Sequence, residues 1–526
     1  RASGRNGVVF SPNTAIQAQW RKADPNLRSL TYQSLAVFDS EADDDEESVI
    51  SRLHPNGLAL IAELADIPDL ILVLDECHHL LHTWGKLLAE VLQRLPNAMV
   101  LGLTATPVAA MTGPETRLQT QLFGQVTYAA NIPEVVSEGD LAPFLELPWL
   151  CKPTAAESDW LAEHDIRTQE LVTHFSDPAV ASVSLYESLH QLESANNWAD
   201  ICLADPDLAD AVLRLANAGL VELPDGAVLR ERHRQAVDFA DWVQVINHWL
   251  GGLADSPDTR DQLLIEQVRQ LLPSVGYRWT KRGIVRSVPT VDRLLARSES
   301  KAIACCEIIR NEANNLGPDL RALVLCDFEL ATAIPASLNQ VVKPDSGSAT
   351  QALKTLMADS DTAVLSPLLV TSNTVSGARE TLEKLAVFAQ SYGYRPVIED
   401  GELPRLVGWR SQQWVGVITD FFQAGHCQIL IGTRGLLGEG WDAHRINCLV
   451  DLTSATTATA VVQLRGRALR IDPQRLNKVA VIWSVTCVGA GILAGADWDR
   501  LVRKHHGYLG LDTFGDVVDG VAHLDE

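Results

Sequence analysis

The sequence predicts an α/β protein with two parallel-sheet lobes and a helical module between them. Strand-like apolar runs alternate with helical stretches towards both ends of the chain and become scarce in the middle. Strands that alternate with helices form βαβ units and parallel sheets. At 526 residues the chain is also too long for one hydrophobic core. We therefore expect a first lobe at residues 1–157, a helical module at 158–300 and a second lobe at 301–526.

The first lobe contains four candidate strands, with a helix expected between the first two. These strands are 8–10, 30–33, 70–75 and 98–104. The run at 70–74 is apolar without alternation, which is typical of a central strand buried on both faces of a parallel sheet.

Helical periodicity dominates the middle module, for example over 208–216 and 236–250. The module ends in the basic and aromatic stretch 277–286, which predicts either a phosphate-contacting surface with a stacking ring or a turn with one packed tryptophan. The second lobe again alternates strands with helices. Its candidate strands are 322–326, 367–371, 428–433, 448–452 and 479–485, and one candidate helix is 378–392.

Charge and composition exclude several classes of protein. The formal charge of −24 argues against a histone-like or tail-driven nucleic-acid binder, although a local basic groove remains compatible with it. The acidic run at 41–47 is expected to be a solvated loop. The nine cysteines include no C-x-x-C pair, so we expect buried thiols in a reducing cytoplasm, with a metal site as the lesser alternative. Neither a bilayer-length apolar stretch nor a signal-peptide pattern is present.

Two adjacent carboxylates, Asp75 and Glu76, follow the apolar run at 70–74. Carboxylates at a strand end are costly unless they meet a cation or solvent. Open α/β sheets bind ligands at the carboxyl edge of their strands. One acid there can hold Mg²⁺ while its neighbour polarises a water, as in a nucleoside triphosphatase. The alternative is a helix N-terminus capped by acids.

Three later stretches could serve the same chemistry. Thr104 and Thr106 end the following strand and could link a nucleotide site to another surface, although T-x-T-P is also a good strand-to-turn sequence. Near 432–442, Gly440 would allow close backbone approach to a phosphate or base, and Asp442 adds an acceptor. A tight loop is the alternative for that stretch.

The stretch 463–470 carries the third pattern. On a helix, Gln463, Arg467 and Arg470 share one face. Two guanidiniums that face the same way suit a multivalent anion, and a γ-phosphate would make them arginine fingers. A basic surface stripe is the alternative, but Gly466 would weaken a purely structural helix.

Taken in order, these stretches resemble a superfamily-two helicase or translocase of the DExH type, within the restriction- or repair-type DEAD/DEAH-box helicases. The resemblance covers both lobes but not the helical module. The matching stretches are 75–78 (Walker B), 104–106 (coupling motif), 432–442 (fifth motif), 463–470 (arginine-finger motif), 11–14 with 19–20 and 31–33 (nucleic-acid contacts), and 138–143 (the segment after the first lobe).

The resemblance implies two RecA-like lobes with ATP and Mg²⁺ bound between them. It implies Asp75 as the Mg²⁺ ligand and Glu76 as the general base. The other implied roles are coupling across the cleft for His78 and Gln463, γ-phosphate contact for Arg467 and Arg470, nucleotide contact for Gly440 and Asp442, coupling of hydrolysis for Thr104 and Thr106, and nucleic-acid contact for Thr14, Gln19, Thr31 and Thr433.

One element of this family is missing from the sequence. The phosphate loop, G-x-x-x-x-G-K-[ST], occurs nowhere, because Gly85-Lys86 continues with Leu87 and lies downstream of Asp75. We expect this loop to lie upstream of the printed chain. The chain as printed is then expected to bind ATP poorly and to be inactive alone.

These observations lead us to expect a nucleic-acid-dependent ATPase that acts as a DNA helicase or translocase in repair, restriction or phage defence, in a bacterial cytoplasm or nucleoid. An RNA helicase is the alternative of the same class, but the form of 438–442 and the helical insertion favour DNA. A catalytically inactive nucleic-acid scaffold without a Walker A loop is the alternative of another class. No membrane partner is expected, and any protein partners should use the helical module.

Overall fold

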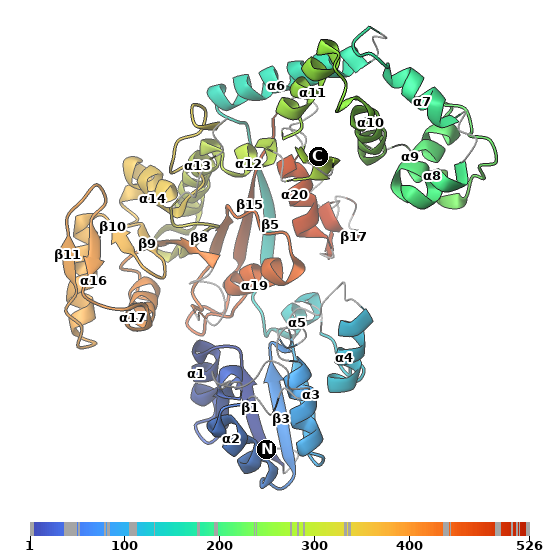
Figure 1. The fold of residues 1–526 in the computed structure, drawn as a ribbon. Coiled ribbons are helices and arrows are strands. Elements are labelled where there is room, and N and C mark those ends of the chain that lie inside the picture. Colours follow the sequence, from blue (N-terminus) through green and yellow to red (C-terminus); the bar gives the residue numbers. More distant parts are fainter. Residues whose placement is uncertain are drawn as a thin grey trace.

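The computed structural model describes residues 5–35, 50, 53–77, 80, 85–104, 113–130, 132–175, 179–193, 198–235, 237, 239–273, 276–280, 283–287, 290–330, 334, 338–434, 441, 443–489, 496–506, 509–511, 514 and 516–521. They form two large sheets, each with covering helices, two two-stranded hairpins and a helical module (Figure 1). The helical module lies across the second lobe from the first lobe in that view. The predicted fold class is confirmed: it is α/β, with two parallel-sheet lobes and a helical module that lies between them in the sequence.

The first sheet has four parallel strands in the order β2-β1-β3-β4. All four strands predicted for this lobe are found, with ends shifted by at most two residues. The strands are β1 (Asn6–Ser11), β2 (Arg28–Thr31), β3 (Leu70–Asp75) and β4 (Met99–Leu103). The helices are α1 (Thr14–Ala23), α2 (Pro55–Ala65), α3 (Gly85–Arg94) and α4 (Gly113–Phe123), with a 3₁₀ turn at Tyr32–Ser34.

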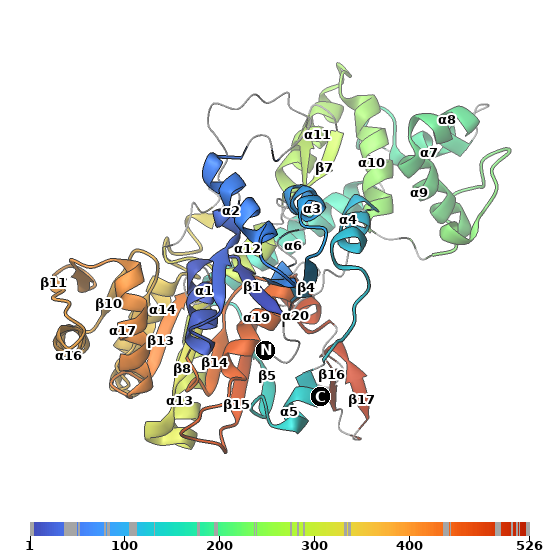
Figure 2. The ribbon, with the colours of Figure 1, turned by 90° about the horizontal axis from the view of Figure 1, so that it is seen from below.

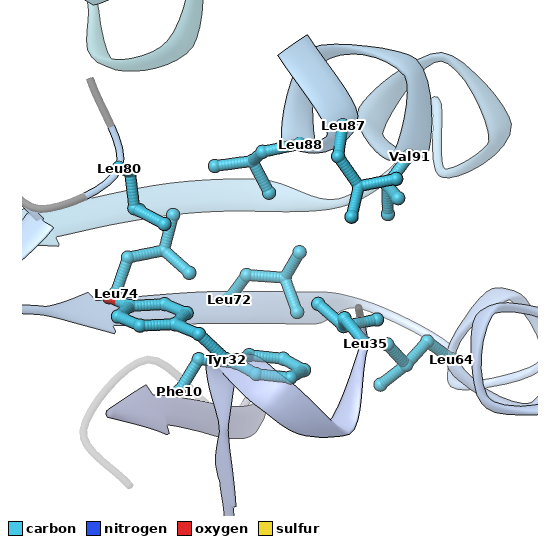
Figure 3. A pocket seen from close by; sticks show the side chains of 10 residues that line it. All are labelled: Phe10, Tyr32, Leu35, Leu64, Leu72, Leu74, Leu80, Leu87, Leu88 and Val91. Carbon is cyan, nitrogen blue, oxygen red and sulfur yellow. The ribbon is translucent and has the colours of Figure 1, made fainter. Parts of the chain in front are cut away.

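One face of β3 forms the core of this lobe. Leu70, Leu72 and Leu74 are buried and pack against leucines of α2 and α3. Figure 3 shows part of this core, where a small pocket is walled by carbon, so it belongs to packing and not to chemistry. Ile71 and Val73 on the opposite face are only half-buried. The expectation that β3 is buried on both faces is therefore wrong for this second face, which has less cover.

Strand β4 is the last strand of the first sheet on its side. Within the part of the chain that the structure describes, no strand bonds to its outer edge. Its Met99 and Leu101 side chains are 52% and 45% exposed. The edge therefore presents apolar side chains and unpaired backbone groups together, which is unusual for an edge strand that ends a sheet.

The helical module contains two small cores of its own. Its helices are α6 (Ala155–Phe175), α7 (Leu185–Glu193), α8 (Trp198–Ala204), α9 (Pro206–Asn217), α10 (Phe239–Leu253), α11 (Thr259–Leu271) and α12 (Thr290–Ala296), with a 3₁₀ turn at Glu231–His233. The stretch 277–286 forms the hairpin β6 (Tyr277–Thr280) and β7 (Gly283–Arg286). Tyr277 is buried, and the Arg269 guanidinium lies 5.4 Å from the centre of the Trp279 ring. The packed tryptophan of the second interpretation fits these contacts, and the phosphate-contacting surface stays a prediction.

The second sheet has nine strands in the order β11-β12-β10-β9-β13-β8-β14-β15-β5. The five predicted strands correspond to β8 (Ala322–Cys326), β9 (Leu368–Val370), β13 (Ile429–Thr433), β14 (Cys448–Asp451) and β15 (Ala480–Cys487). The strands β10 (Val375–Gly377), β11 (Val397–Glu399) and β12 (Arg405–Val407) were not predicted and extend one edge in antiparallel fashion. A separate hairpin is formed by β16 (Leu509–Leu511) and β17 (Val517–Asp519).

Helices cover both faces of the second sheet, whose two buried clusters lie on opposite sides of it. The helices are α5 (Ile132–Glu138), α13 (Glu299–Leu316), α14 (Ala349–Ala358), α15 (Ser360–Ala363), α16 (Arg379–Gln390), α17 (Ser411–Gln423), α19 (Ala458–Ala468) and α20 (Ala496–His505), with a 3₁₀ turn at Gly317–Asp319. In Figures 1 and 2, α19 lies on the side of the second lobe that faces α1 and the first sheet.

Strand β5 (Phe144–Cys151) belongs to the second sheet, although the sequence analysis included it in the first-lobe range 1–157. It pairs in parallel with β15 from Phe144 opposite Ala480 to Cys151 opposite Cys487. Pro148 fits this edge position, since proline removes one ladder donor and is tolerated on edge strands. The chain therefore crosses from the first sheet to the second before Phe144.

Candidate functional site

A cleft between the two lobes brings together residues from both ends of the chain. It contains about 1080 Å³ of space free of protein atoms, part of it open to solvent. Gln19, Asp75 and Glu76 line it from the first lobe. Gln463, Arg467 and Arg470 line it from α19 of the second lobe. The predicted acidic pair and the predicted arginine face thus share one cavity.

Asp75, the last residue of β3, is held by three hydrogen bonds. Its Oδ2 accepts from the indole Nε1–H of Trp20 at 2.7 Å, and its Oδ1 accepts from the backbone N–H of Glu76 at 3.0 Å. Its main-chain carbonyl accepts from the Tyr32 hydroxyl at 2.6 Å. Burial raises the pKa of Tyr32, and the nearby Cys77, Asp75 and Glu76 add to this, so the hydroxyl keeps the proton that it donates.

Glu76 has a φ of +52°, in the left-handed region that side chains with a Cβ rarely adopt. Such strain persists where the surrounding structure fixes it, and it is concentrated at functional sites. Here β3 and the hydrogen bonds on Asp75 fix the preceding residue. Burial raises the pKa of the neighbouring Cys77 thiol to about 11, so this side chain is a neutral part of the core.

The arginine face of α19 is anchored on Trp441. Arg467 is buried and donates to the Trp441 carbonyl, which also accepts from Arg470 at 3.1 Å. The Trp441 indole N–H donates to Thr419 Oγ1 at 2.8 Å, which fixes this residue in turn. Among the described residues, no hydrogen-bond partner is found for Nε2 of Gln463, which is buried at the cleft.

Two further features hold α19 in place. On its opposite face, Arg465 forms a buried ion pair with Glu146 of β5, with Nε–Oε1 and Nη2–Oε2 distances of 2.5 and 2.8 Å. At its end, Lys478 donates to the carbonyls of His444 and Arg470. Burial lowers the pKa of Lys478 to about 8. The helix is therefore braced by one buried carboxylate and one buried amine.

Gly466 leaves the backbone of α19 bare where the helix lines the cleft. A Cβ added there would meet no protein atom within 4 Å, so packing does not require glycine at this position. Glycine in a helix interior lowers stability, which makes a functional reason for its presence more plausible than a structural one. Close approach of a ligand to this turn would be such a reason.

The other predicted site residues are placed as follows. Thr14 is exposed at the start of α1, and Thr104 is exposed after β4. Thr31 is buried at the end of β2, with its Oγ1 3.1 Å from Ser34 Oγ. Thr433 is half-buried at the end of β13. None of these four lines the cleft. Gln19, which was predicted to contact nucleic acid, lines the cleft instead, because it lies on α1 beside the carboxyl end of β3. His78, Thr106, Gly440 and Asp442 lie outside the described residues.

Sequence reasoning missed the residues that hold the predicted ones. Trp20 and Tyr32 were quoted within motifs but were given no role, and the Trp441 carbonyl was not considered. The segment before β5 was also missed as a wall of the cleft, where Leu141 lies and where the Ala142 N–H donates to the Leu469 carbonyl at 2.7 Å. Only the resemblance of 138–143 pointed to this segment.

The cleft residues fit a magnesium nucleotide by the chemistry of their donors. In the part of the chain that the structure describes, no group of three or more His, Cys, Asp and Glu side chains could form an all-protein metal site. Mg²⁺ does not need one, because it is commonly held by one or two carboxylates, waters and substrate phosphates. Each Asp75 oxygen accepts one bond from the protein and retains a second acceptor site. Arg467 and Arg470 line the same cleft as this carboxylate pair, and guanidinium groups are suited to phosphate by their chemistry.

Two lobes with parallel sheets, and carboxylates and guanidiniums that line one cleft between them, are the arrangement of a helicase-like protein. Residues 6–109 match the family described as type III restriction enzyme, res subunit. This match confirms the resemblance to the superfamily-two helicases.

Solved structures similar to the chain include the Hef helicase domain of Pyrococcus furiosus (TM-score 0.38, 15% identity, 95% of this chain and 89% of that chain). They also include a fragment described as an HsdR subunit of a type I restriction enzyme from Vibrio vulnificus YJ016 (TM-score 0.37, 12% identity, 91% of this chain and 53% of that chain). No curated protein matches the chain. Among the described residues, none of the helices has the length and apolar character needed to cross a membrane.

Proposed function

We propose that the protein is a nucleic-acid-dependent ATPase that works as a DNA helicase or translocase in repair, restriction or phage defence, in a bacterial cytoplasm. The observation that supports this most is the shared cleft, in which Asp75 and Glu76 of one lobe face Arg467 and Arg470 of the other. The cleft contains a cavity of about 370 Å³, which is in the range of small-molecule and cofactor sites.

In the proposed mechanism each side chain has one task. Asp75 would hold Mg²⁺, which when bound neutralises charge on the phosphates. Glu76 takes a proton from the attacking water as general base. Arg467 and Arg470 donate to the γ-phosphate and stabilise its charge in the transition state.

The separation of the two lobes can depend on whether nucleotide is bound, because the two walls of the cleft belong to different lobes. A phosphate that binds both walls draws the lobes together, and its release lets them separate. Gln463 of α19, the coupling residues Thr104 and Thr106, and His78 are proposed to pass this motion on. Gly440 and Asp442 are proposed nucleotide contacts.

Nucleic acid is proposed to bind outside the cleft, over Thr14, Thr31 and Thr433. The position of Gln19 in the cleft supports contact with the nucleotide in place of its predicted contact with nucleic acid.

We also propose that a further strand pairs with β4 and carries the missing phosphate loop. The outer edge of β4 is bonded to no described strand, and its Met99 and Leu101 side chains are exposed. A parallel strand at this edge would satisfy the backbone and cover both side chains. The printed chain should then bind ATP poorly, and a protein that supplies such a strand and loop should bind it. Equal binding by both chains would contradict this arrangement.

The experiment that tests the function compares the complete protein with its Glu76→Gln variant. Phosphate release is measured with single-stranded DNA, duplex DNA and RNA in parallel. Stimulated hydrolysis should disappear in the variant while ATP binding persists, because the amide cannot take the proton from water. Glu134→Gln, on α5 next to the cleft-lining Val135 and exposed, is the matched control that should retain turnover.

Each alternative gives a different result in the same experiment. Unchanged turnover in Glu76→Gln would refute Glu76 as the general base. Stimulation by RNA and not by DNA would identify the RNA helicase. Binding of nucleic acid without hydrolysis in the complete protein would identify the scaffold.

A further inference from the structure

We propose that Trp20 and Tyr32 are positioning residues that connect the nucleic-acid-contacting segments of the first lobe to Asp75. The proposal rests on the function above, since it explains how a bound strand would stimulate hydrolysis in the cleft. The two aromatic side chains come from different segments, and each directs its single donor to the same residue. Trp20 holds the carboxylate of Asp75, and Tyr32 holds its main-chain carbonyl.

Trp20 makes its contact from helix α1, which begins at Thr14. It lies half-buried on α1, and its Nε1–H donates to Asp75 Oδ2 at 2.7 Å. Thr14, the proposed strand contact, starts the same helix about 9 Å away along the axis. The helix is capped by Asn13, whose side chain accepts from the Ile16 N–H at 3.0 Å. A strand that displaces or orders Thr14 must therefore move the indole as well.

Tyr32 acts on the backbone beside the proposed general base. It is buried next to Thr31, and its hydroxyl donates to the Asp75 carbonyl at 2.6 Å. That carbonyl belongs to the peptide that joins Asp75 to Glu76, whose φ is +52°. The orientation of this peptide sets where the Glu76 side chain starts. Tyr32 therefore fixes the direction of Glu76 through the peptide that joins it to Asp75.

Packing alone does not account for these two donors. The Tyr32 ring lies nearly parallel to Phe10 with centroids 6.4 Å apart, and Figure 3 shows it beside Phe10 and Leu74 in the core. A phenylalanine would fill the same space. The Tyr32 hydroxyl and the Trp20 indole N–H serve to orient Asp75, because each hydrogen bond holds one of its acceptor oxygens in one direction. Groups that orient a metal ligand typically change metal affinity or activity about 10- to 100-fold when they are removed.

The test uses Trp20→Phe and Tyr32→Phe in the complete protein, since both changes keep an aromatic ring and remove one donor. We expect the Mg²⁺ concentration at half-maximal turnover to rise about tenfold or more in Trp20→Phe. In Tyr32→Phe we expect kcat to fall with little change in the KM for ATP, because Glu76 loses its direction. In both variants, stimulation by oligothymidylate should be lost while the strand still binds by fluorescence anisotropy.

Two variants elsewhere serve as matched controls. Trp249→Phe removes an indole bond to the Val183 carbonyl (2.7 Å) in the helical module, and Tyr392→Phe removes a hydroxyl bond to Asp420 (2.7 Å) in the second lobe. Both should keep the Mg²⁺ dependence and the stimulation of the unmodified protein.

A second measurement does not depend on turnover. The protein is labelled with 5-fluorotryptophan, and the ¹⁹F resonance of Trp20 is identified by its loss in Trp20→Phe. Mg²⁺ alone and oligothymidylate alone should each shift this resonance and leave that of Trp249 in place. Oligothymidylate that binds without moving the Trp20 resonance would overturn the positioning role and leave the proposed function intact. Failure of the strand to bind at all would overturn the proposed function, and this role with it.

Discussion

The left-handed backbone of Glu76 predicts that this residue lowers the stability of the fold. Its φ of +52° brings a Cβ too close to the following carbonyl, which costs about 1–2 kcal/mol in an L-residue. Glu76→Ala keeps this Cβ, whereas Glu76→Gly removes it. Glycine also makes the unfolded chain more flexible, which reduces the stability gained by removing the Cβ by about 0.4–1 kcal/mol. We therefore expect the glycine variant to be more stable than the alanine variant by about 1 kcal/mol, with both inactive.

The neighbouring Cys77 supplies an assay for this region. The Cys77 side chain is 9% exposed, and its pKa is raised to about 11. A thiol reagent can therefore modify it only when the surrounding structure opens. When opening and closing are fast compared with labelling, the rate reports the free energy of opening. A difference of about 1 kcal/mol should make labelling of the Cys77 peptide about fivefold slower in Glu76→Gly than in Glu76→Ala, as followed by mass spectrometry.

An alanine-to-glycine change at an ordinary position supplies the control. Ala62 is exposed within α2, which packs on the same core, and glycine there should lower stability by about 0.5–1 kcal/mol. Ala62→Gly should therefore not slow the labelling of Cys77. If Glu76→Gly labels faster than Glu76→Ala, the reasoning about backbone strain is refuted.

Two further predictions concern Arg467 on α19 and Lys478, which follows that helix. Arg467→Ala in the complete protein should lower DNA-stimulated turnover about a thousandfold, as measured by phosphate release, because arginine fingers contribute at that level; a loss below about tenfold would leave Arg467 a structural charge only. The unmodified protein should become more stable as the pH rises from 8 to 10.5, and Lys478→Met should lack this rise. Chemical unfolding of both proteins across this range measures the difference. The folded pKa of Lys478 is lowered from 10.5 to about 8, so in this window the unfolded chain binds the proton that the folded chain has released, and stability increases with pH. Each pKa unit corresponds to about 1.4 kcal/mol, which gives an upper limit of about 3 kcal/mol; a pH-independent difference between the two proteins would contradict the burial argument.

The strands whose two ends local pattern predicts correctly, β3 and β8, each contain five consecutive apolar residues. β8, for example, has the bounds that the sequence predicts, because an uninterrupted apolar run bounded by polar residues carries its own signal. The strands β10, β11 and β12 have only three residues each and escaped prediction. β5 was assigned to the first lobe's range because its partner β15 lies far downstream, and no local pattern shows which sheet an edge strand joins.

The candidate site divides in the same way. Its reactive side chains could be recognised from the sequence, since carboxylates after an apolar strand and arginines on one helix face are local patterns. The groups that hold these side chains in place could not be recognised from the sequence. The Trp441 carbonyl that receives Arg467 and Arg470, and the Glu146 carboxylate that pairs with Arg465, come from segments that no spacing connects with α19.

By itself the sequence determined the class of fold, the order of the motifs and the residue types that could act on a phosphate. Those properties follow from local periodicity and side-chain chemistry, which do not depend on where the lobes lie. The tertiary structure alone decided that Asp75 and Arg467 line one cleft, that Gln19 lies inside it, and that Trp20 and Tyr32 both bond to Asp75. A hydrogen bond of 2.7 Å requires two segments to be fixed relative to each other by the packing of a whole lobe, and no stretch of sequence contains that information.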